Sequence, residues 1–284
     1  MFNTAYRNIK LFFRDKSSVF FSLLSVFIII GLYTLFLGDM LASNMQQYTG
    51  ARFLMDSWIM AGLVAVTSVT ATMGAFGIMV EDKSKKIYKD FYVSPVKRYN
   101  IAGGYLLSAL FISVVMSIIT VILTELYVLS NGGEWMPLGA ALKVLGLILL
   151  SALSSSSFVF FIVSFFRSTN AYGVASTILG TLIGFLTGIY IPIGNLPAAV
   201  QTVIKFFPVS HSAALLRQVM MEAPMSATFA GAPAQFATEF KEMMGVTFTY
   251  GNSTADAGLH IVVLALTTVV FFALTVVNLS RKEK

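Results

Sequence analysis

EDKSKKIYKDFYVSPVKR, residues 81–98, is a charged segment between two long runs of apolar and small residues. It contains six of the nineteen basic residues of the chain, namely Lys83, Lys85, Lys86, Lys89, Lys97 and Arg98. Connections this rich in lysine and arginine stay on the cytoplasmic side of a membrane. This segment, called the cytoplasmic island below, therefore predicts a membrane protein and fixes its orientation.

The middle of the cytoplasmic island predicts a short helix with one apolar face. Its large side chains are Ile87, Tyr88, Phe91 and Tyr92. Their spacing of one, four and five residues places them on one side of a helix, and the lysines occupy the other sides. An apolar face outside the lipid needs a partner surface, so we expect this helix to bind another protein.

The composition and the hydrophobic pattern predict an all-α integral membrane protein with six transmembrane helices. Hydrophobic residues make up 57% of the 284 residues and charged residues 11%, whereas soluble domains carry roughly 25% charge. A spanning helix needs about 20 apolar residues. The segments that fit are 19–37, 57–80, 101–129, 138–166, 171–191 and 257–279.

The distribution of basic residues predicts that both termini lie in the cytoplasm. Fourteen of the nineteen basic residues fall in the N-terminal segment, the cytoplasmic island, Arg167 and the C-terminus. The other five are spread over longer connections on the opposite side, as the positive-inside rule requires. We therefore expect a multi-pass protein of the cell (plasma) membrane that forms a single domain over residues 1–284.

Several classes of function have no support in the sequence. The chain has no cysteine and only two histidines, too few for a structural zinc site. Its net charge of +6 sits at the ends of apolar segments and forms no stripe suited to nucleic acid. No phosphate-binding loop, nucleophile–base pair or carboxylate pair is present. We expect no catalytic residue, metal or cofactor on this chain.

Residues 1–18 predict an amphipathic helix that lies flat at the cytoplasmic interface. Its apolar side carries Phe2, Tyr6, Ile9 and Phe13, and its basic side carries Arg7, Lys10 and Arg14. In such a helix the rings enter the lipid and the cations face anionic headgroups. Ordinary charge ahead of a membrane span is the alternative interpretation.

Residues 192–256 predict an exterior re-entrant hairpin followed by a small cap. Two apolar helices too short to span are separated by Pro208, with Ser210 as N-cap and Pro224 as stop of the second. Lipid tolerates such a hairpin only where protein satisfies the interrupted backbone. Residues 225–256 are soluble in character, with an amphipathic helix around Phe240 and a β-prone run at 246–250.

Four further features leave their roles open. Glu125 is an acidic residue inside a predicted span, where a proton relay competes with simple exposure at the interface. His260 lies four residues after Asp256, where an ion pair between the two competes with simple solvation at the helix end; solvation also explains His211, which stands alone in the hairpin. In the fifth span, one face has no side chains because it carries Gly180, Gly184 and Gly188. That face favours helix packing, and a pathway or subunit seam is the alternative.

Three passages give the chain a family resemblance that covers nearly its whole length. They are RNIKLFFRDKSSVFF (7–21), the end of the island with SPVKRYNIAGG (94–104), and FFPVSHSAALLRQ (206–218). Together they resemble the permease subunit of an ATP-binding-cassette exporter of the ABC-2 type. In that family an acidic start, a short helix, Ser-Pro and a basic residue form the coupling helix, which docks into a groove of the ATPase subunit.

The resemblance implies a set of contacts with that ATPase subunit. They are Glu81, Asp82, Ile87, Tyr88, Phe91, Tyr92, Ser94, Pro95 and Arg98. The chain has Ser84, Lys85 and Lys86 where many relatives carry Gly-Thr, so its ATPase partner is expected to be equally specific. The resemblance further implies two permease chains, expected as a homodimer with a paralogous second chain as the alternative, two ATPase subunits that hold ATP and Mg, and surrounding membrane lipids.

Function follows from this resemblance and from the residues together. Aromatic-rich spans without buried charge favour an amphipathic or lipid-linked cargo, such as a drug, lipid, glycan or peptide, over a small ion. A secondary transporter or channel is one alternative, although it needs a midplane ion site or inverted repeats. A non-transporting sensor or scaffold is another, for which segment 225–256 would serve.

Overall fold

The computed structural model describes the chain except for residues 44–47, 49, 88–95, 252 and 282–284. Within the described residues, six helices are long and apolar enough to cross a membrane, judged by length and composition. They are α2 (Lys16–Leu32), α4 (Ala51–Ser84), α6 (Arg98–Ser130), α7 (Leu138–Ser164), α8 (Thr169–Leu186) and α13 (Ala257–Arg281). The prediction of an all-α membrane protein with six spans is confirmed.

The first, second and fifth spans differ from their predicted bounds. After α2 the chain continues through a π-helical turn, η1 (Tyr33–Leu37), into the short helix α3 (Gly38–Ser43). Helix α4 begins at Ala51, before the predicted residue 57. Gly50, with φ of 83°, turns the chain into the helix, and the charged residues of its first turns, Arg52 and Asp56, form an ion pair. Helix α8 ends at Leu186, before the predicted residue 191, and Gly188 with φ of 72° redirects the chain.

Helix α4 forms the centre of the bundle. It contacts α2, α6, α7 and α8, and nearly all its side chains between Leu54 and Val80 are buried. Small residues allow close approach: a Cβ on Gly62 would lie 2.6 Å from Cγ1 of Ile189. Buried hydroxyls bond back to the helix, as Thr72 does to the carbonyl of Ser68 at 2.6 Å, so they need no water.

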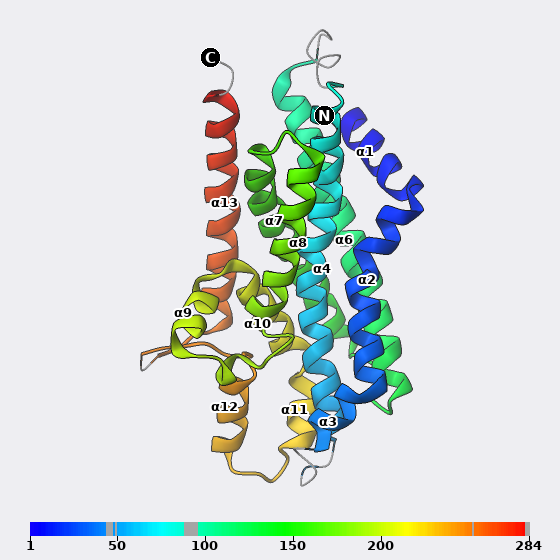
Figure 1. The fold of residues 1–284 in the computed structure, drawn as a ribbon. Coiled ribbons are helices and arrows are strands. Elements are labelled where there is room, and N and C mark those ends of the chain that lie inside the picture. The colour runs from blue at the N-terminus through cyan, green and yellow to red at the C-terminus, as the bar shows by residue number, and fades with distance from the viewer. Residues whose placement is uncertain (44–47, 49, 88–95, 252, 282–284) are drawn as a thin grey trace.

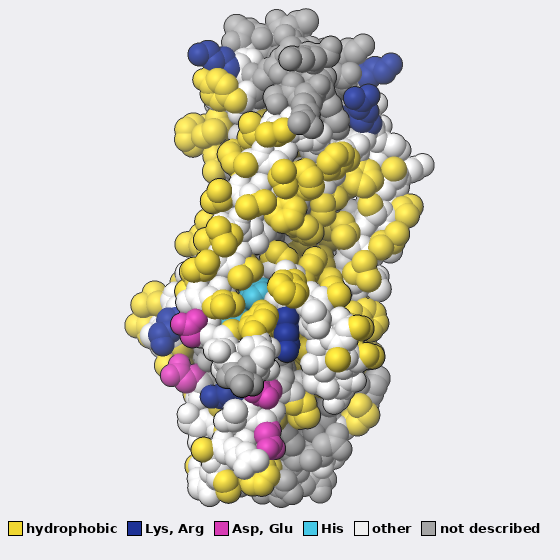
Figure 2. All heavy atoms as spheres, turned by 90° about the vertical axis from the view of Figure 1, so that its left-hand side faces the viewer, with side chains coloured by type: hydrophobic (Ala, Val, Ile, Leu, Met, Phe, Trp, Pro, Cys, Tyr) yellow, Lys and Arg dark blue, Asp and Glu magenta, His cyan; other side chains and the backbone are white. Residues whose placement is uncertain are grey.

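The outer surface of the bundle is apolar over most of its length. Figure 2 shows a broad hydrophobic belt, with charged side chains gathered toward the two ends. On α13 the exposed large residues include Val262, Leu266, Val269 and Phe272. Contiguous exposed surface of this kind is stable in lipid and not in water.

Toward the end opposite the two termini the chain folds into short elements (Figure 1). They are η2 (Ile193–Asn195), α9 (Ala198–Phe206), α10 (Pro208–Met220), α11 (Glu222–Thr228), α12 (Ala234–Met243) and the antiparallel pair β1 (Thr249–Tyr250) and β2 (Ser253–Thr254). The expected helix near Phe240 and the β-prone run are both present. Helix α10 packs against α4, α7 and α13, and most of its residues are buried.

Two details of this region differ from expectation. Helix α10 begins at Pro208 with Phe207 as N-cap, because proline suits the first helical position. Ser210 is therefore inside the helix, and its hydroxyl donates to the carbonyl of Leu186 at 2.8 Å, which ties α10 to the end of α8. Pro224 does not stop α10 but lies in the first turn of α11.

Candidate functional site

The N-terminal helix α1 (Phe2–Arg14) lies obliquely against the bundle at the end that holds both termini (Figure 1). It ends because Asp15 leaves helical geometry, with φ of −82° and ψ of 92°. The Asp15 carboxylate then caps α2: it accepts from the backbone N–H of Ser17 at 3.1 Å and from the hydroxyl of Ser18 at 2.6 Å. The resulting bend sets the angle between α1 and α2.

A partly buried ion pair fixes α1 to the two helices that lead into the cytoplasmic island. The Arg7 guanidinium donates to both carboxylate oxygens of Asp82 in α4, at 2.7 and 2.9 Å. Tyr105 of α6 donates its hydroxyl to the same carboxylate, and the Asn8 amide donates to Ser108 at 3.3 Å. The hydrogen bond to Asp82 raises the pKa of Arg7. We call Arg7, Asn8, Asp82, Tyr105 and Ser108 the α1 clamp.

Helix α1 has three sides, one more than the sequence pattern predicted. Ala5, Asn8 and Phe12 are buried against the protein. The predicted apolar side is next to it, and its members Phe2 and Tyr6 are 73% and 68% exposed. Arg7 reaches Asp82 instead of facing headgroups, which corrects that expectation. The close contact with α6 depends on glycine, since a Cβ on Gly104 would lie 2.5 Å from that of Thr4.

The cytoplasmic island is described only at its edges. Five of its predicted contact residues lie outside the described residues, and they are Tyr88, Phe91, Tyr92, Ser94 and Pro95. Glu81 is exposed and pairs with Lys85, and Ile87 is half-buried. Asp82 is 3% exposed, so its carboxylate is used inside the α1 clamp. Since α4 ends at Ser84 and Arg98 begins α6, the island joins both helices directly.

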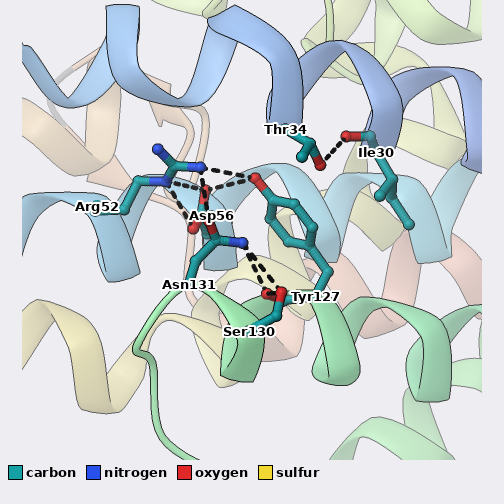
Figure 3. A network of polar contacts seen from close by, with 7 residues as sticks. All are labelled: Ile30, Thr34, Arg52, Asp56, Tyr127, Ser130 and Asn131. Atoms are coloured by element: carbon teal, nitrogen blue, oxygen red, sulfur yellow. Dashed lines mark hydrogen bonds and ion pairs between the residues drawn. The ribbon is translucent and has the colours of Figure 1, made fainter.

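A polar network missed by the sequence analysis lies at the other end of α4 and α6 (Figure 3). Asp56, which is 1% exposed, accepts two hydrogen bonds from Nε of Arg52 at 3.0 and 3.1 Å. The same guanidinium donates to the Tyr127 hydroxyl and to the Asn131 side chain, both at 3.1 Å. The spacing of four residues between Arg52 and Asp56 was the available signal.

Arg217 of α10 is a fully buried cation. Its guanidinium lies over the ring of Trp58 at 4.8 Å and donates to the carbonyl of Gly245 at 3.5 Å. Its Nε and Nη2 atoms have no hydrogen-bond partner among the described residues. Burial lowers the pKa of Arg217 to about 9. A buried charge so poorly partnered is costly, which sets Arg217 apart from the surface cations.

The two histidines form a buried pair, which corrects the expectation of solvated helix ends. His211 and His260 are 1% and 0% exposed, and their Nδ1 atoms lie 2.7 Å apart. Nε2 of His211 lies 2.9 Å from the carbonyl of Lys205, which can only accept, so in the neutral pair this nitrogen carries the proton and His260 donates from Nδ1. Asp256 instead caps α13 through the N–H of Leu259 at 2.9 Å.

The three glycines of the fifth span have different surroundings. A side chain at Gly180 would meet nothing within 4 Å, so this part of α8 is free to receive another helix. Gly184 packs against the ring of Tyr190 of the same chain, and Gly188 lies past the end of α8. The glycine face is therefore shorter than predicted. Its contact with a second chain stays a prediction.

Comparison with known proteins points in one direction. A family model described as ABC-2 family transporter protein matches residues 41–277. Nodulation protein J of Rhizobium leguminosarum bv. trifolii is 32% identical over 92 residues, which make up 32% of this chain and 34% of that protein. The match thus spans about a third of this relative's length. The family model, in contrast, takes in the island, the Arg52–Asp56 network, Arg217 and the histidine pair.

Proposed function

Because the chain belongs to the ABC-2 transporter family, we propose that it is the permease subunit of an exporter energised by a separate ATPase subunit. Members of this family are transmembrane subunits of ABC transporters that work with an ABC ATPase partner. ATP and Mg are then held by that partner. The cytoplasmic island is the proposed docking element, with Tyr88, Phe91 and Tyr92 seated in the ATPase.

The α1 clamp is the observation that carries this proposal. It joins α1, α4 and α6 through Asp82 at the point where α4 enters the island. A force applied to the island therefore reaches three helices at once, and they move together as a rigid body. Since α4 is the buried centre of the bundle, the force also reaches α10, which α4 contacts at the other end.

The short helices that follow α8 fit the proposed exterior closure. Helix α10 is too short to cross a membrane, and protein surrounds it on three sides, as a re-entrant segment in lipid requires. Its buried charge Arg217 and its histidine His211 lie between α4 and α13. Movement of α10 away from α4 would open the bundle on the exterior side and release the cargo.

Three further parts of the proposal concern the surroundings of the chain. The exposed Phe2 and Tyr6 suit contact with lipid at the cytoplasmic interface of the plasma membrane, beside Lys10 and Arg14. Both termini lie on that side. Two permease chains form a homodimer with two ATPase subunits, and the open face at Gly180 suits the contact between them.

Co-purification tests the proposal. The tagged chain, solubilised gently from its native membrane, is expected to bring down a subunit that carries a phosphate-binding loop. The variant Phe91→Ala/Tyr92→Ala should remain in the membrane and lose that subunit, because the docking face is removed. The variant Lys89→Ala, which changes a lysine that the sequence pattern places away from the apolar face of the same island, is the matched control. Absence of any phosphate-loop subunit from the unmodified complex refutes the proposal.

A further inference from the structure

A cavity of about 290 Å³ lies at the end of the bundle opposite the termini. Its walls come from α4, α6, the α6–α7 connection, α7, and the α10–α11 junction. The residues that matter below are Phe53, Glu125, Trp135, Lys143 and Glu222. The volume is near the lower limit of about 300 Å³ for small-molecule sites, so the cavity suits a ligand with one ring or a short alkyl chain.

Glu125 gives the cavity its chemical character. This residue of α6 is half-buried, and its carboxylate accepts one hydrogen bond, from the N–H of Met136 at 3.1 Å. No basic side chain among the described residues pairs with it. A carboxylate inside a membrane-length helix is costly unless a cation compensates it, and the cavity beside it leaves room for one.

The other charged residues of the cavity do not compensate the Glu125 carboxylate. Among the described residues Lys143 is the only basic one on the wall, and its Nζ lies 3.9 Å from Oε2 of Glu222. Both side chains are more than 60% exposed, so this surface pair is weak. With Glu134 also on the wall, the acids outnumber the lysine by three to one. The field in the cavity therefore favours a positively charged ligand.

Trp135 and Phe53 supply the apolar part of the site. Trp135 is 66% exposed and lies on the rim beside Met136, whose backbone holds Glu125. An aromatic face attracts a quaternary ammonium or protonated amine by the cation–π interaction, most strongly for tryptophan. The Glu125 carboxylate and the Trp135 indole, both on the cavity wall, therefore favour the same kind of ligand, a cation with an apolar body.

We propose that this cavity binds a cationic amphiphile, a small amine or quaternary ammonium ion with an aromatic or alkyl body, on the exterior side of the permease. Its role as cargo at the exit of the transport path rests on the proposed function. Binding itself requires only the cavity. Glu125 balances the charge, Trp135 covers the cation, and Phe53 contacts the apolar body.

Binding is tested on the full-length chain as it is purified, with or without an accompanying ATPase subunit, reconstituted in discs of zwitterionic phosphatidylcholine. The probe is benzyltrimethylammonium, and phenylmethanesulfonate, of similar shape and opposite charge, is its control. Calorimetric titration should show saturable binding of the cation and none of the anion. Since Trp58 is buried and Trp135 is exposed, and the chain has two tryptophans, the cation should also change the fluorescence of Trp135.

The variant Glu125→Gln keeps the size of the side chain and should weaken cation binding roughly tenfold. Trp135→Leu should weaken it several-fold and abolish the fluorescence response. The matched control is Glu239→Gln, which alters an exposed carboxylate of α12 held by Gln235 at 2.7 Å and absent from the cavity wall. That variant should bind as the unmodified protein does.

Three results would overturn the inference: equal binding of the sulfonate, an unchanged affinity in Glu125→Gln, or no binding of the cation at all. The proposed function is refuted by a different result. If the cation binds as described and no phosphate-loop subunit accompanies the chain, the binding site is supported and the exporter function is refuted. If the subunit is present and the cation does not bind, the exporter function is supported and the proposed ligand class is wrong.

Discussion

Loss of Arg7 should release α1 from the bundle. The Asp82 carboxylate is buried, at 3% exposure of the residue, and in Arg7→Ala it keeps only the Tyr105 hydroxyl of its two partners in the clamp. Removal of one partner of a buried ion pair costs about 3–5 kcal/mol. Because the Arg7 side chain is 33% exposed, solvent screens part of this, and we expect about 2–3 kcal/mol.

The absence of cysteine from the sequence makes this release measurable. Ala5 is 3% exposed on the buried side of α1, so a cysteine at this position reacts with maleimide only when α1 lifts. A loss of about 2–3 kcal/mol should accelerate labelling of Ala5→Cys roughly 30- to 150-fold in the Arg7→Ala background. A cysteine at Tyr6, which is 68% exposed, should react quickly in both backgrounds.

The double variant separates the ion pair from general damage. Asp82→Asn added to Arg7→Ala removes the uncompensated charge, so labelling of Ala5→Cys should slow again. Unchanged labelling of Ala5→Cys in the Arg7→Ala background, or strictly additive effects of the two substitutions, would refute the role assigned to the clamp.

Three further predictions concern the other end of the bundle. Burial lowers the pKa of His211, so the unfolded chain binds its proton first as pH drops below about 6.5. The free energy of unfolding should then fall by at most ~1.4 kcal/mol per pH unit, and the thermal midpoint should fall with it; His211→Gln should flatten this dependence. Arg217→Met should keep or raise thermal stability, since an apolar residue replaces a buried charge over Trp58, while coupled ATPase activity falls; a large loss of stability would contradict this. Gly62→Ala should cost about 1–3 kcal/mol by thermal unfolding, because the new Cβ meets Ile189, and an unchanged midpoint would show that Ile189 moves aside.

The sequence predicted the spans well because lipid imposes a simple rule. Any helix in hydrocarbon must be long and apolar, and that property is local in sequence. The predicted start of the second span failed because an acidic residue is paired within its own helix. Asp56 seemed to lie outside the second span, whereas the structure neutralises it with Arg52 inside α4.

Contacts between distant residues could not be predicted from local pattern. The helical period of α1 separated its apolar and basic sides, and it carried no sign that Asn8 would bond Ser108, a hundred residues away. The histidines looked solitary for the same reason, since His211 and His260 meet only when α10 packs on α13. The break between α9 and α10 at Pro208 could be predicted, because the effect of proline on the backbone is local.

ATP hydrolysis by the reconstituted complex is the direct test of the proposed coupling. Permease and ATPase subunit are placed together in lipid vesicles, and the hydrolysis rate is compared for the unmodified chain, Phe91→Ala/Tyr92→Ala and Lys89→Ala. We expect that the permease alters the hydrolysis rate of its partner, that the double variant loses this effect, and that Lys89→Ala retains it. Full retention of the effect in the double variant would contradict a coupling role for the cytoplasmic island.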